Sequence, residues 1–248
     1  MVHTESRYYE LSNFAKTFNY GTILTDIEDF FGYLHNKDEI DDVGFKLQVC
    51  VKNSKPMYLH GYILTSALYE YLDTQILDGI TILEVGTARG FSSICMALIL
   101  KEFDIQGTIH TIDRQDKFDN CIKAAELKRR VSVHECVEEW KDIVDKYIKF
   151  EKGDYKNKLK ELDTKLDRIN FAFLDAAEDY RTIKSQLEFI ESKQKTDDII
   201  ILDDYTATQY PDIVRAVDDF IQNGNYYHKI FFGNDGIKNR GYVYLSKK

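Results

Sequence analysis

Residues 81–100 read TILEVGTARGFSSICMALIL, and this stretch decides the fold. An apolar run over 80–85 ends at Gly86, Gly90 follows after three residues, and an apolar helical pattern begins at Phe91. This order is typical of a buried strand, a glycine turn and a helix. A helix that begins there points free backbone N–H groups at whatever lies above the turn, and the glycines let a ligand approach the backbone closely. The stretch therefore predicts the floor of a nucleotide-like cofactor site.

The length of the chain indicates the number of domains, and its net charge indicates which kinds of partner to expect. The chain has 248 residues, of which 44% are hydrophobic, and an α/β domain often reaches about 250 residues as one unit. One large domain with an N-terminal extension is the simplest prediction. The net charge is −9, and an acidic surface repels phosphate backbones, so we expect no nucleic-acid partner.

The spacing of the cysteines and the length of the apolar runs bear on where in the cell the protein is found. The four cysteines form no CxxC pair, which is typical of reduced thiols in a cytosolic protein. The first ten residues, MVHTESRYYE, contain no apolar signal core, and no apolar run approaches the roughly 20 residues that a membrane helix needs. We therefore expect a cytoplasmic protein that does not bind membranes.

From residue 80 onward, short apolar runs alternate with helical patterns. We expect strands at 80–85, 107–112, 131–136, 169–174 and 198–202, and helices at 91–102, 116–129, 179–192 and 211–222. The runs are rich in branched residues, as buried parallel strands are, and their alternation with helices predicts βαβ units.

The last two apolar runs differ from the others. The segments 226–232 and 240–246 are joined by a link too short for a crossover helix, so they should pair antiparallel. The predicted fold class is α/β, a doubly wound, Rossmann-like, seven-stranded and mostly parallel sheet with a C-terminal antiparallel hairpin.

Three other segments have weaker patterns. Helical spacing predicts helices over 22–35 and 60–77, and alternation over 45–51 indicates a strand or an extended flap, with a helix as the open alternative. Residues 141–168 are dense in charge, which favours a solvated helical insertion between two strands; a lid or a dimer contact is the alternative.

Carboxylates stand at nearly every predicted strand end, where doubly wound sheets bind their ligands. They are Glu84, Asp113, Glu138, Asp175, Asp203 and Asp204. Asp113 is placed to accept hydrogen bonds from two ribose hydroxyls. Its alternative role is the N-cap of the 116–129 helix, for which Asp116 is the other candidate.

The turn reads E-x-G-x-x-x-G and not the G-x-G-x-x-G of dinucleotide sites. The carboxylate of Glu84 would repel a pyrophosphate but would suit a cofactor that carries a positive amine. This argues against a nicotinamide-dependent oxidoreductase, which stays the less favoured enzyme.

Four motifs in order make a family recognisable: EVGTARGFSS at 84–93, TIDRQD at 111–116, FAFLDAAEDYRTIKSQLEFI at 171–190, and IIILDDY at 199–205 with PDIVRAVDDFI at 211–221. Over about residues 60–246 the chain resembles class I S-adenosylmethionine-dependent methyltransferases. Within them it is most similar to the small-molecule O-methyltransferases of the methyltransferase domain 24 type, relatives of sugar, macrolide and catechol enzymes.

The resemblance implies the domain limits and the cofactor site. Residues 1–75 would form a helical extension that caps the substrate, and 76–248 the S-adenosylmethionine-binding methyltransferase domain. Within the site, Asp113 would bind the ribose, and the residues after the third strand would flank the adenine. The implied cofactor residues are Glu84, Gly86, Thr87, Ala88, Gly90, Ser92, Asp113, Arg114, Cys136, Val137 and Asp175.

A metal and a base are also implied. Asp175, Asp203 and Asp204 match metal positions of the metal-dependent members, and three carboxylates suit Mg²⁺, which would lower the pKa of a substrate hydroxyl. Asp175 and Glu178 are the predicted catalytic residues. Ala177 stands where relatives often carry a base, and Glu178 is either the base or a carboxylate of the first helical turn.

The remaining polar residues have plainer expected roles. We expect Asp197 and Asp198, which replace a glycine pair of the family, to form only a different turn. His110 is expected in the sheet and His35 at the surface. His60 is expected at the start of a helix, without a catalytic role; the alternative is that it faces the substrate.

The predicted function is transfer of a methyl group from S-adenosylmethionine to a hydroxyl of a small, sugar-like or natural-product-like molecule, with or without the assistance of Mg²⁺. The non-enzyme alternative is a cofactor-binding protein that has lost its chemistry, which Ala177 keeps open. A homodimer through the N-terminal helix or 141–168 is a further expectation.

Overall fold

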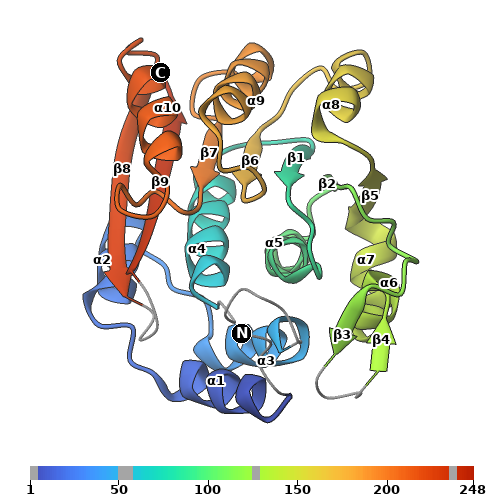
Figure 1. The fold of residues 1–248 in the computed structure, drawn as a ribbon. Coiled ribbons are helices and arrows are strands. Elements are labelled where there is room, and N and C mark those ends of the chain that lie inside the picture. The colour runs from blue at the N-terminus through green and yellow to red at the C-terminus, as the bar shows by residue number, and fades with distance from the viewer. Residues whose placement is uncertain (1–4, 50–57, 125–128, 235–238) are drawn as a thin grey trace.

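A seven-stranded sheet runs through the middle of the protein, and helices lie on both of its faces (Figure 1). The computed structural model describes residues 5–49, 58–124, 129–234 and 239–248. The strands of the sheet are β1 (Ile80–Val85), β2 (Gly107–Asp113), β5 (Ile148–Lys152), β6 (Phe171–Leu174), β7 (Ile199–Leu202), β8 (Tyr226–Asn234) and β9 (Asn239–Lys247).

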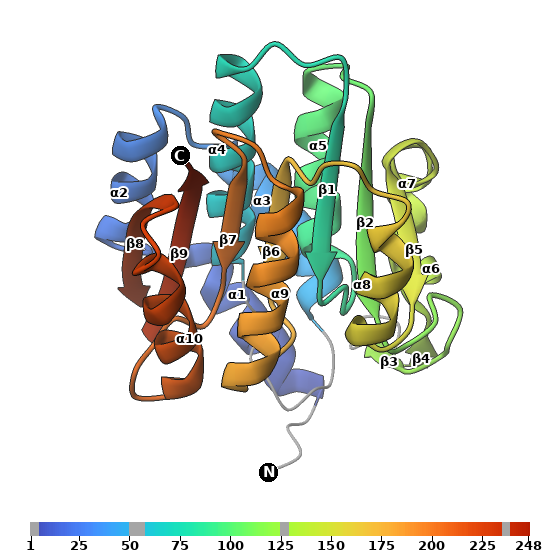
Figure 2. The ribbon, with the colours of Figure 1, turned by 90° about the horizontal axis from the view of Figure 1, so that it is seen from above.

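The strand order is β5-β2-β1-β6-β7-β9-β8, which Figure 2 shows from one edge to the other. All neighbouring strands are parallel except β9, which is antiparallel to both β7 and β8. The predicted fold class and the C-terminal hairpin are therefore confirmed.

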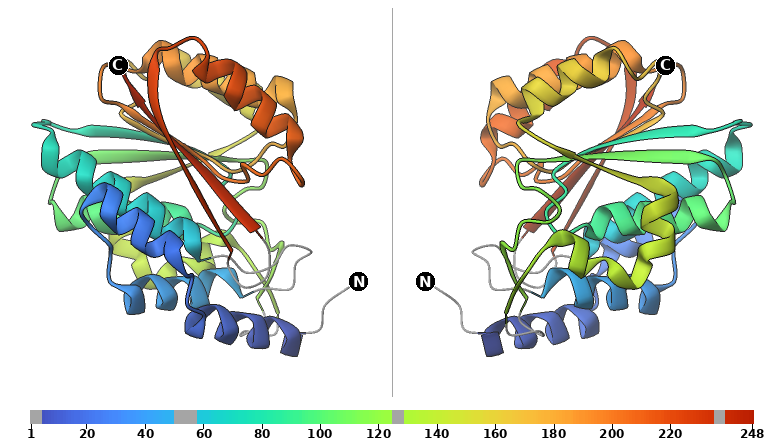
Figure 3. Two further views of the ribbon diagram at one scale, coloured as in Figure 1. Left: turned by 90° about the vertical axis from the view of Figure 1, so that its left-hand side faces the viewer. Right: turned by 90° about the vertical axis from the view of Figure 1, so that its right-hand side faces the viewer.

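Two helical layers enclose the sheet, as the side views of Figure 3 show. The larger helices are α1 (Glu5–Thr17), α2 (Thr22–Phe31), α3 (Lys37–Gln48), α4 (Leu59–Thr74), α5 (Phe91–Glu102), α7 (Lys141–Tyr147), α8 (Tyr155–Asp163), α9 (Tyr180–Lys193) and α10 (Pro211–Ile221). Helices α2 to α5 and α7 share one core with one face of the sheet, and α8 to α10 pack on the other face. None of these described helices is both long and apolar enough to cross a membrane.

Strand β1 shows how its sequence serves both cores. Ile82 belongs to the core under α4 and α5, whereas Leu83 and Val85 belong to the core under α8 to α10. Successive side chains of a strand point to opposite faces, so a strand covered on both faces is apolar throughout. This is why 80–85 reads as a continuous apolar run.

The N-terminal helices do not form a separate core. Ile40, Val43 and Leu47 of α3 are buried at helical spacing, and the side chain of Asn36 accepts a hydrogen bond from the backbone N–H of Asp38 at the start of this helix. The expected strand over 45–51 is therefore wrong for 45–48, which are helical, because a short alternation can also arise on a helix. Residues 50 and 51 lie outside the described residues.

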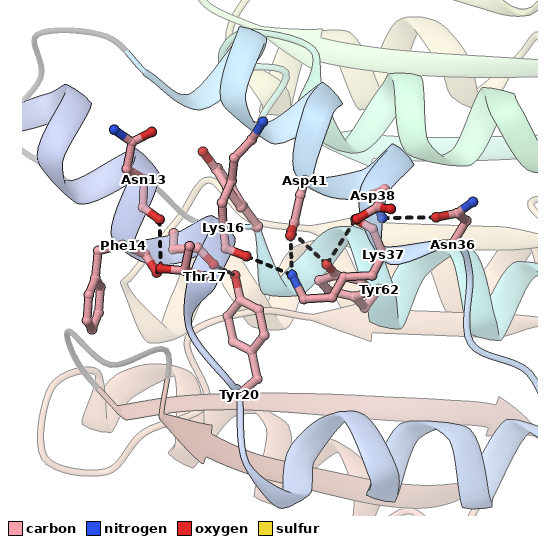
Figure 4. A network of polar contacts seen from close by, with 12 residues as sticks. Asn13, Phe14, Lys16, Thr17, Tyr20, Asn36, Lys37, Asp38, Asp41 and Tyr62 are labelled. Carbon is pink, nitrogen blue, oxygen red and sulfur yellow. Dashed lines mark hydrogen bonds and ion pairs between the residues drawn. The ribbon is translucent and has the colours of Figure 1, made fainter.

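A polar cluster joins three of these helices beneath the apolar contacts (Figure 4). Lys37 forms an ion pair with Asp41 and donates a hydrogen bond to the backbone carbonyl of Lys16, at 2.9 Å. Tyr62 of α4 donates to the Asp41 carboxylate at 2.7 Å. Because Asp41 is buried, these partners compensate its charge and fix α1 and α3 against α4.

The middle of the chain departs most from expectation. The predicted helix over 116–129 is wrong for its described residues, 116–124 and 129, and the predicted strand over 131–136 is wrong beyond Val131. In their place lie a small antiparallel pair, β3 (Ile122–Ala124) and β4 (Arg129–Val131), the short helix α6 (Val133–Cys136) and a 3₁₀ turn (Glu138–Trp140). Ser132 and Glu135 form a capping box that starts α6, which explains why VSVHEC does not continue as a strand.

The third parallel strand is β5, inside the segment expected to be a helical insertion. Its sequence, IKFEK, places charges between its apolar residues because β5 is the edge of the sheet, with β2 as its single neighbour. Residues 141–168 are therefore an αβα part of the fold and not a helix added to it.

Asp198 is a buried anchor and not only a turn residue. Arg168 donates to both of its carboxylate oxygens, at 2.9 and 2.6 Å, and Tyr71 donates to it at 2.8 Å. A fully buried carboxylate needs such partners, and their convergence ties α4 to the start of β7.

His110 gives a pH-dependent stability. It lies buried on β2 with its Nδ1 3.1 Å from the Glu151 carboxylate, and burial lowers its pKa more than this carboxylate raises it. Below about pH 6.5 a free histidine is protonated, so unfolding takes up a proton there. The free energy of unfolding therefore decreases as the pH is lowered through that range. Urea denaturation at pH 7 and pH 5.5 should show a smaller pH effect for His110→Gln than for the wild type; equal effects would contradict this.

Candidate active site

The strand order reverses between β1 and β6. From β1 the chain builds outward through β2 and β5, and it then returns to build β6, β7 and the hairpin on the other side. Ligands of open α/β sheets bind at such a switch point, outside the carboxyl ends of the strands. Here the backbone N–H of Asp175, just after β6, donates to the Val85 carbonyl at 3.0 Å, so the two strand ends meet directly.

The glycine turn is built for close backbone approach. Gly86 has a φ of +116°, and a Cβ added there would lie 2.4 Å from the carbonyl oxygen of Asp175. Gly90, at the N-cap of α5, has a φ of +86°. L-residues rarely adopt these angles, so both glycines are needed to bring the turn close to β6.

Glu84 lies under this turn and is fully buried. Its carboxylate accepts hydrogen bonds from the hydroxyls of Ser92 and Ser93 in the first turn of α5. Burial raises the pKa of Glu84, and the two hydroxyls partly offset that rise. The structure thus places Glu84 and Ser92 together as a support for the start of α5.

A cavity of about 560 Å³ lies above the turn. Such a volume is typical of small-molecule sites. Five of the predicted cofactor residues line it: Gly86, Ala88, Asp113, Arg114 and Asp175. Thr87 instead lines a smaller neighbouring cavity of about 140 Å³, which it shares with Asp113. Glu84, Gly90 and Ser92 are not among the residues that line either cavity.

Asp113 is held at the end of β2 by two backbone groups. One carboxylate oxygen accepts from the N–H of Ala88 and the other from the N–H of Gln115, both at 3.0 Å. The alternative role, as a cap of a 116–129 helix, is wrong because that helix does not form. Each oxygen keeps a second lone pair, so the carboxylate can still accept two hydroxyl donors.

The residues after the third strand are not those expected. Cys136 and Val137 end α6, and Val137 packs against Gly90, 3.0 Å from the position of an added Cβ. The cavity is lined instead by Gly153 and Tyr155, which follow β5. A Gly-Asp pair after the alternating IKFEK was the signal in the sequence, because Asp154 caps α8 by accepting from the N–H of Lys156.

Arg89 links the glycine turn to the N-terminal helices. Its guanidinium donates to the backbone carbonyl of Leu47 at 2.7 Å and to the side chain of Gln48 at 2.6 Å. The C-terminal end of α3 is thereby fixed to the turn, so the N-terminal segment reaches the edge of the sheet where the cavity lies.

Carboxylates gather on the β6 and β7 side of the turn. Asp175, Asp203 and His60 offer ligand atoms that all lie within 4.8 Å of one another. The His60 Nδ1 is 3.9 Å from the Asp203 carboxylate. Asp204, which has a φ of +62°, instead forms an ion pair with the buried Arg240 at 3.6 Å.

The pKa values of the two grouped carboxylates are shifted in opposite directions. Desolvation by the surrounding protein and the neighbouring Asp203 and Asp204 carboxylates raise the pKa of Asp175, although this residue is exposed at the surface of the cavity. Burial disfavours the charged form of Asp203, but the His60 imidazole and the charge of Arg240 outweigh it and hold the pKa of Asp203 below its ordinary value. The cationic Arg240 therefore favours the ionised form of both carboxylates.

This donor set does not fit the expected Mg²⁺ site. Mg²⁺ requires oxygen ligands, whereas one of the three grouped side chains is an imidazole. The third expected ligand, Asp204, is paired with a guanidinium that would repel a dication. Arg240 was missed as a site residue and His60 was kept only as an alternative, because they come from β9 and α4, outside the βαβ alternation.

Glu178 also lines the cavity and is exposed. It precedes Asp179, whose side chain accepts from the N–H of Thr182 as the N-cap of α9. Both roles expected of Glu178, a base or a carboxylate near a helix start, are compatible with this position, and its catalytic role stays a prediction.

Comparisons with known proteins agree with this geometry. Residues 83–205 match the model of a family described as "Methyltransferase domain". No curated protein matches the chain significantly. Among solved structures, the O-methyltransferase TomG from Streptomyces achromogenes, in complex with SAM, has a TM-score of 0.62 at 14% identity, over 90% of this chain and 96% of that chain.

Two further solved structures have the same fold. An O-methyltransferase from Bacillus cereus, in complex with SAH, has a TM-score of 0.61 at 13% identity, over 99% of this chain and 100% of that chain. The O-methyltransferase NovP has a TM-score of 0.55 at 19% identity, over 75% and 78% of the two chains. The family match, the strand order and the glycine turn make residues 83–205 a methyltransferase domain, within a chain that has the fold of S-adenosylmethionine-dependent O-methyltransferases.

Proposed function

We propose that the protein methylates a hydroxyl group of a small molecule. The observation that carries this proposal is the cavity at the switch point, which brings Gly86, Asp113 and Asp175 together beside a cluster of proton-accepting side chains. S-adenosylmethionine, when bound, supplies an electrophilic methyl group on a sulfonium. The three similar structures described above are O-methyltransferases, which supports a hydroxyl acceptor.

The residues of the cavity fit this cofactor. Gly86, where an added Cβ would meet the Asp175 backbone, lets the turn pack against the end of β6 and lines the cavity there. Asp113 would accept the two ribose hydroxyls, and Gly153 and Tyr155 would lie along the adenine. The Asp175 carboxylate would face the amine or sulfonium end, where a positive charge is stabilised.

Positioning is the main catalytic task of this site. Methyl transfer is an in-line displacement, so its rate depends on holding the acceptor oxygen opposite the sulfur. The N-terminal segment, fixed to the turn by Arg89, would cap the acceptor and exclude water. We do not propose the Mg²⁺-assisted form of the reaction, because Asp204, one of the expected ligands, forms an ion pair with Arg240. The cytoplasmic location, the homodimer and the absence of a nucleic-acid partner stay predictions.

Calorimetry tests the proposal. The protein should bind S-adenosylmethionine and S-adenosylhomocysteine, and it should release S-adenosylhomocysteine with at least one member of a panel of hydroxylated sugars, phenols and polyketides. No binding at millimolar cofactor would contradict the cofactor assignment. Binding without turnover would instead favour a cofactor-binding protein that has lost its chemistry, and an NADH fluorescence titration should show no binding.

A further inference from the structure

Arg240 is an unusual cation for this position. It stands near the start of β9 with 5% of its surface exposed, and its Nη1 lies 3.6 Å from the Asp204 carboxylate. The same charge acts on both grouped carboxylates, because it lowers the pKa of Asp203 and opposes the rise at Asp175. A buried guanidinium therefore pairs with Asp204 and acts through its charge on Asp175 and Asp203.

The guanidinium carries a fixed charge. Arginine stays protonated at every pH at which proteins are studied. A dication placed among the three carboxylates would lie beside this charge in a poorly solvated environment, where like charges repel strongly. The positive charge of the cluster is thus carried by a side chain of β9.

His60 adds a proton acceptor. Its ring is 5% exposed and lies between the rings of Phe91 and Phe173, with centroid distances of 4.9 and 5.8 Å. Its Nδ1 faces the Asp203 carboxylate at 3.9 Å. A carboxylate on Nδ1 favours the tautomer that carries the proton there, which leaves Nε2 as the basic nitrogen. Catalytic hydrogen bonds are often long before substrate binds.

We propose that Arg240 and His60 together take the place of a divalent cation, so that methyl transfer here is independent of metal. The proposal rests on the proposed function. Arg240 is a positioning residue that holds Asp204 through their ion pair. His60, oriented by Asp203, is the catalytic base.

The chemical step balances without another reactant. A lone pair of the acceptor oxygen forms the new O–C bond, and the methyl C–S bond breaks with its electron pair left on sulfur. The hydroxyl proton passes to Nε2 of His60 and then to solvent. The products are the methyl ether and S-adenosylhomocysteine.

The first test concerns the metal. Wild-type turnover should be unchanged by EDTA and by added Mg²⁺ or Mn²⁺, and calorimetry should show no Mg²⁺ binding at millimolar concentration. Arg240→Gln should lose at least tenfold in turnover and should gain measurable Mg²⁺ binding, because Asp204 is then unpaired from its cation. Arg240→Lys keeps the charge and should stay insensitive to Mg²⁺.

Arg168→Gln is the matched control, because it also removes a guanidinium from a buried carboxylate, Asp198. It should lower the melting temperature without creating any Mg²⁺ binding. If Arg240→Gln proves unfolded by circular dichroism, Asp204→Asn separates the same pair from the other side, and its turnover should fall while EDTA still has no effect.

The second test concerns the base. His60→Ala should lower kcat about 100-fold, leave the affinity for S-adenosylhomocysteine within threefold, and regain turnover with added imidazole. A merely structural role would not be rescued by imidazole. Glu178→Gln examines the other candidate base: a large kcat loss there, with His60→Ala nearly as active as the wild type, would overturn the assignment of His60.

The outcomes separate the two proposals. Absence of S-adenosylhomocysteine binding by the wild type would overturn the proposed function itself. Normal binding with turnover that is lost in EDTA and restored by Mg²⁺ would overturn only the metal-independent assignment, as would an Arg240→Gln variant that behaves like the wild type.

Discussion

Replacing Asp113 by alanine is expected to weaken S-adenosylmethionine binding by about 100-fold. A hydrogen bond to a charged group contributes about 1.5–3 kcal/mol, and this carboxylate would lose two ribose hydroxyls. Since each 1.4 kcal/mol is about tenfold in affinity, about 3 kcal/mol corresponds to about 100-fold. The substitution also removes the acceptor of the Ala88 N–H at 3.0 Å, so the turn loses one of its supports. Isothermal calorimetry measures the change directly.

Two variants separate the lost ligand contact from general damage. Asp113→Asn keeps one acceptor oxygen and should bind the cofactor with intermediate affinity. Asp104→Ala removes an exposed carboxylate beyond the far end of α5 and should bind like the wild type. An Asp113→Ala variant that binds within threefold of the wild type would show that the ribose lies elsewhere.

The central strands of the sheet could be predicted from the sequence because helices cover them on both faces. Strands β6 and β7 are buried throughout, and β1 is buried at every residue except Thr81, so each appears as a short and mainly apolar run. The glycines after β1 marked the turn, and the short link after β8 marked the hairpin. These signals are local, which is why a single chain suffices to find them.

The edge of the sheet was not readable in the same way. Strand β5 has one neighbour and alternates apolar with charged residues, a pattern that a solvated helix shares. The segment before it forms β3, β4 and α6, where the capping box at Ser132 competes with the apparent strand over 131–136. The error passed on to Cys136 and Val137, because their predicted role depended on which strand was third.

The residues of the site also divide into those that the sequence predicts and those that it does not. Asp113, Asp175 and Asp203 follow strands, so the rule that carboxyl ends meet at one edge placed them correctly. His60 and Arg240 reach the cluster from the start of α4 and from β9, and no spacing along the chain connects them to it. Their contribution is a property of tertiary packing, and for that reason the sequence did not predict the guanidinium that pairs with Asp204.

Gly86→Ala is expected to disrupt both stability and cofactor binding. The residue has a φ of +116°, and an added Cβ would lie 2.4 Å from the Asp175 carbonyl oxygen, closer than real Cβ atoms approach other atoms. Backbone strain of this kind costs about 1–3 kcal/mol, and the overlap must also push β6 away from β1. A total of at least about 3 kcal/mol corresponds to a melting temperature lower by roughly 6–12 °C for a chain of this size.

Gly224→Ala is the matched control for this substitution. Gly224 also has a positive φ, +75°, but an added Cβ there would have no heavy atom within 4 Å. It should therefore cost only the strain of a left-handed L-residue, about 1 kcal/mol, and leave S-adenosylhomocysteine binding intact. The expected order is wild type, Gly224→Ala, then Gly86→Ala in thermal denaturation, with binding lost in the last alone. Equal stability of the two variants would mean that the contact between Gly86 and Asp175 does not close the switch point, because the steric overlap is what distinguishes them.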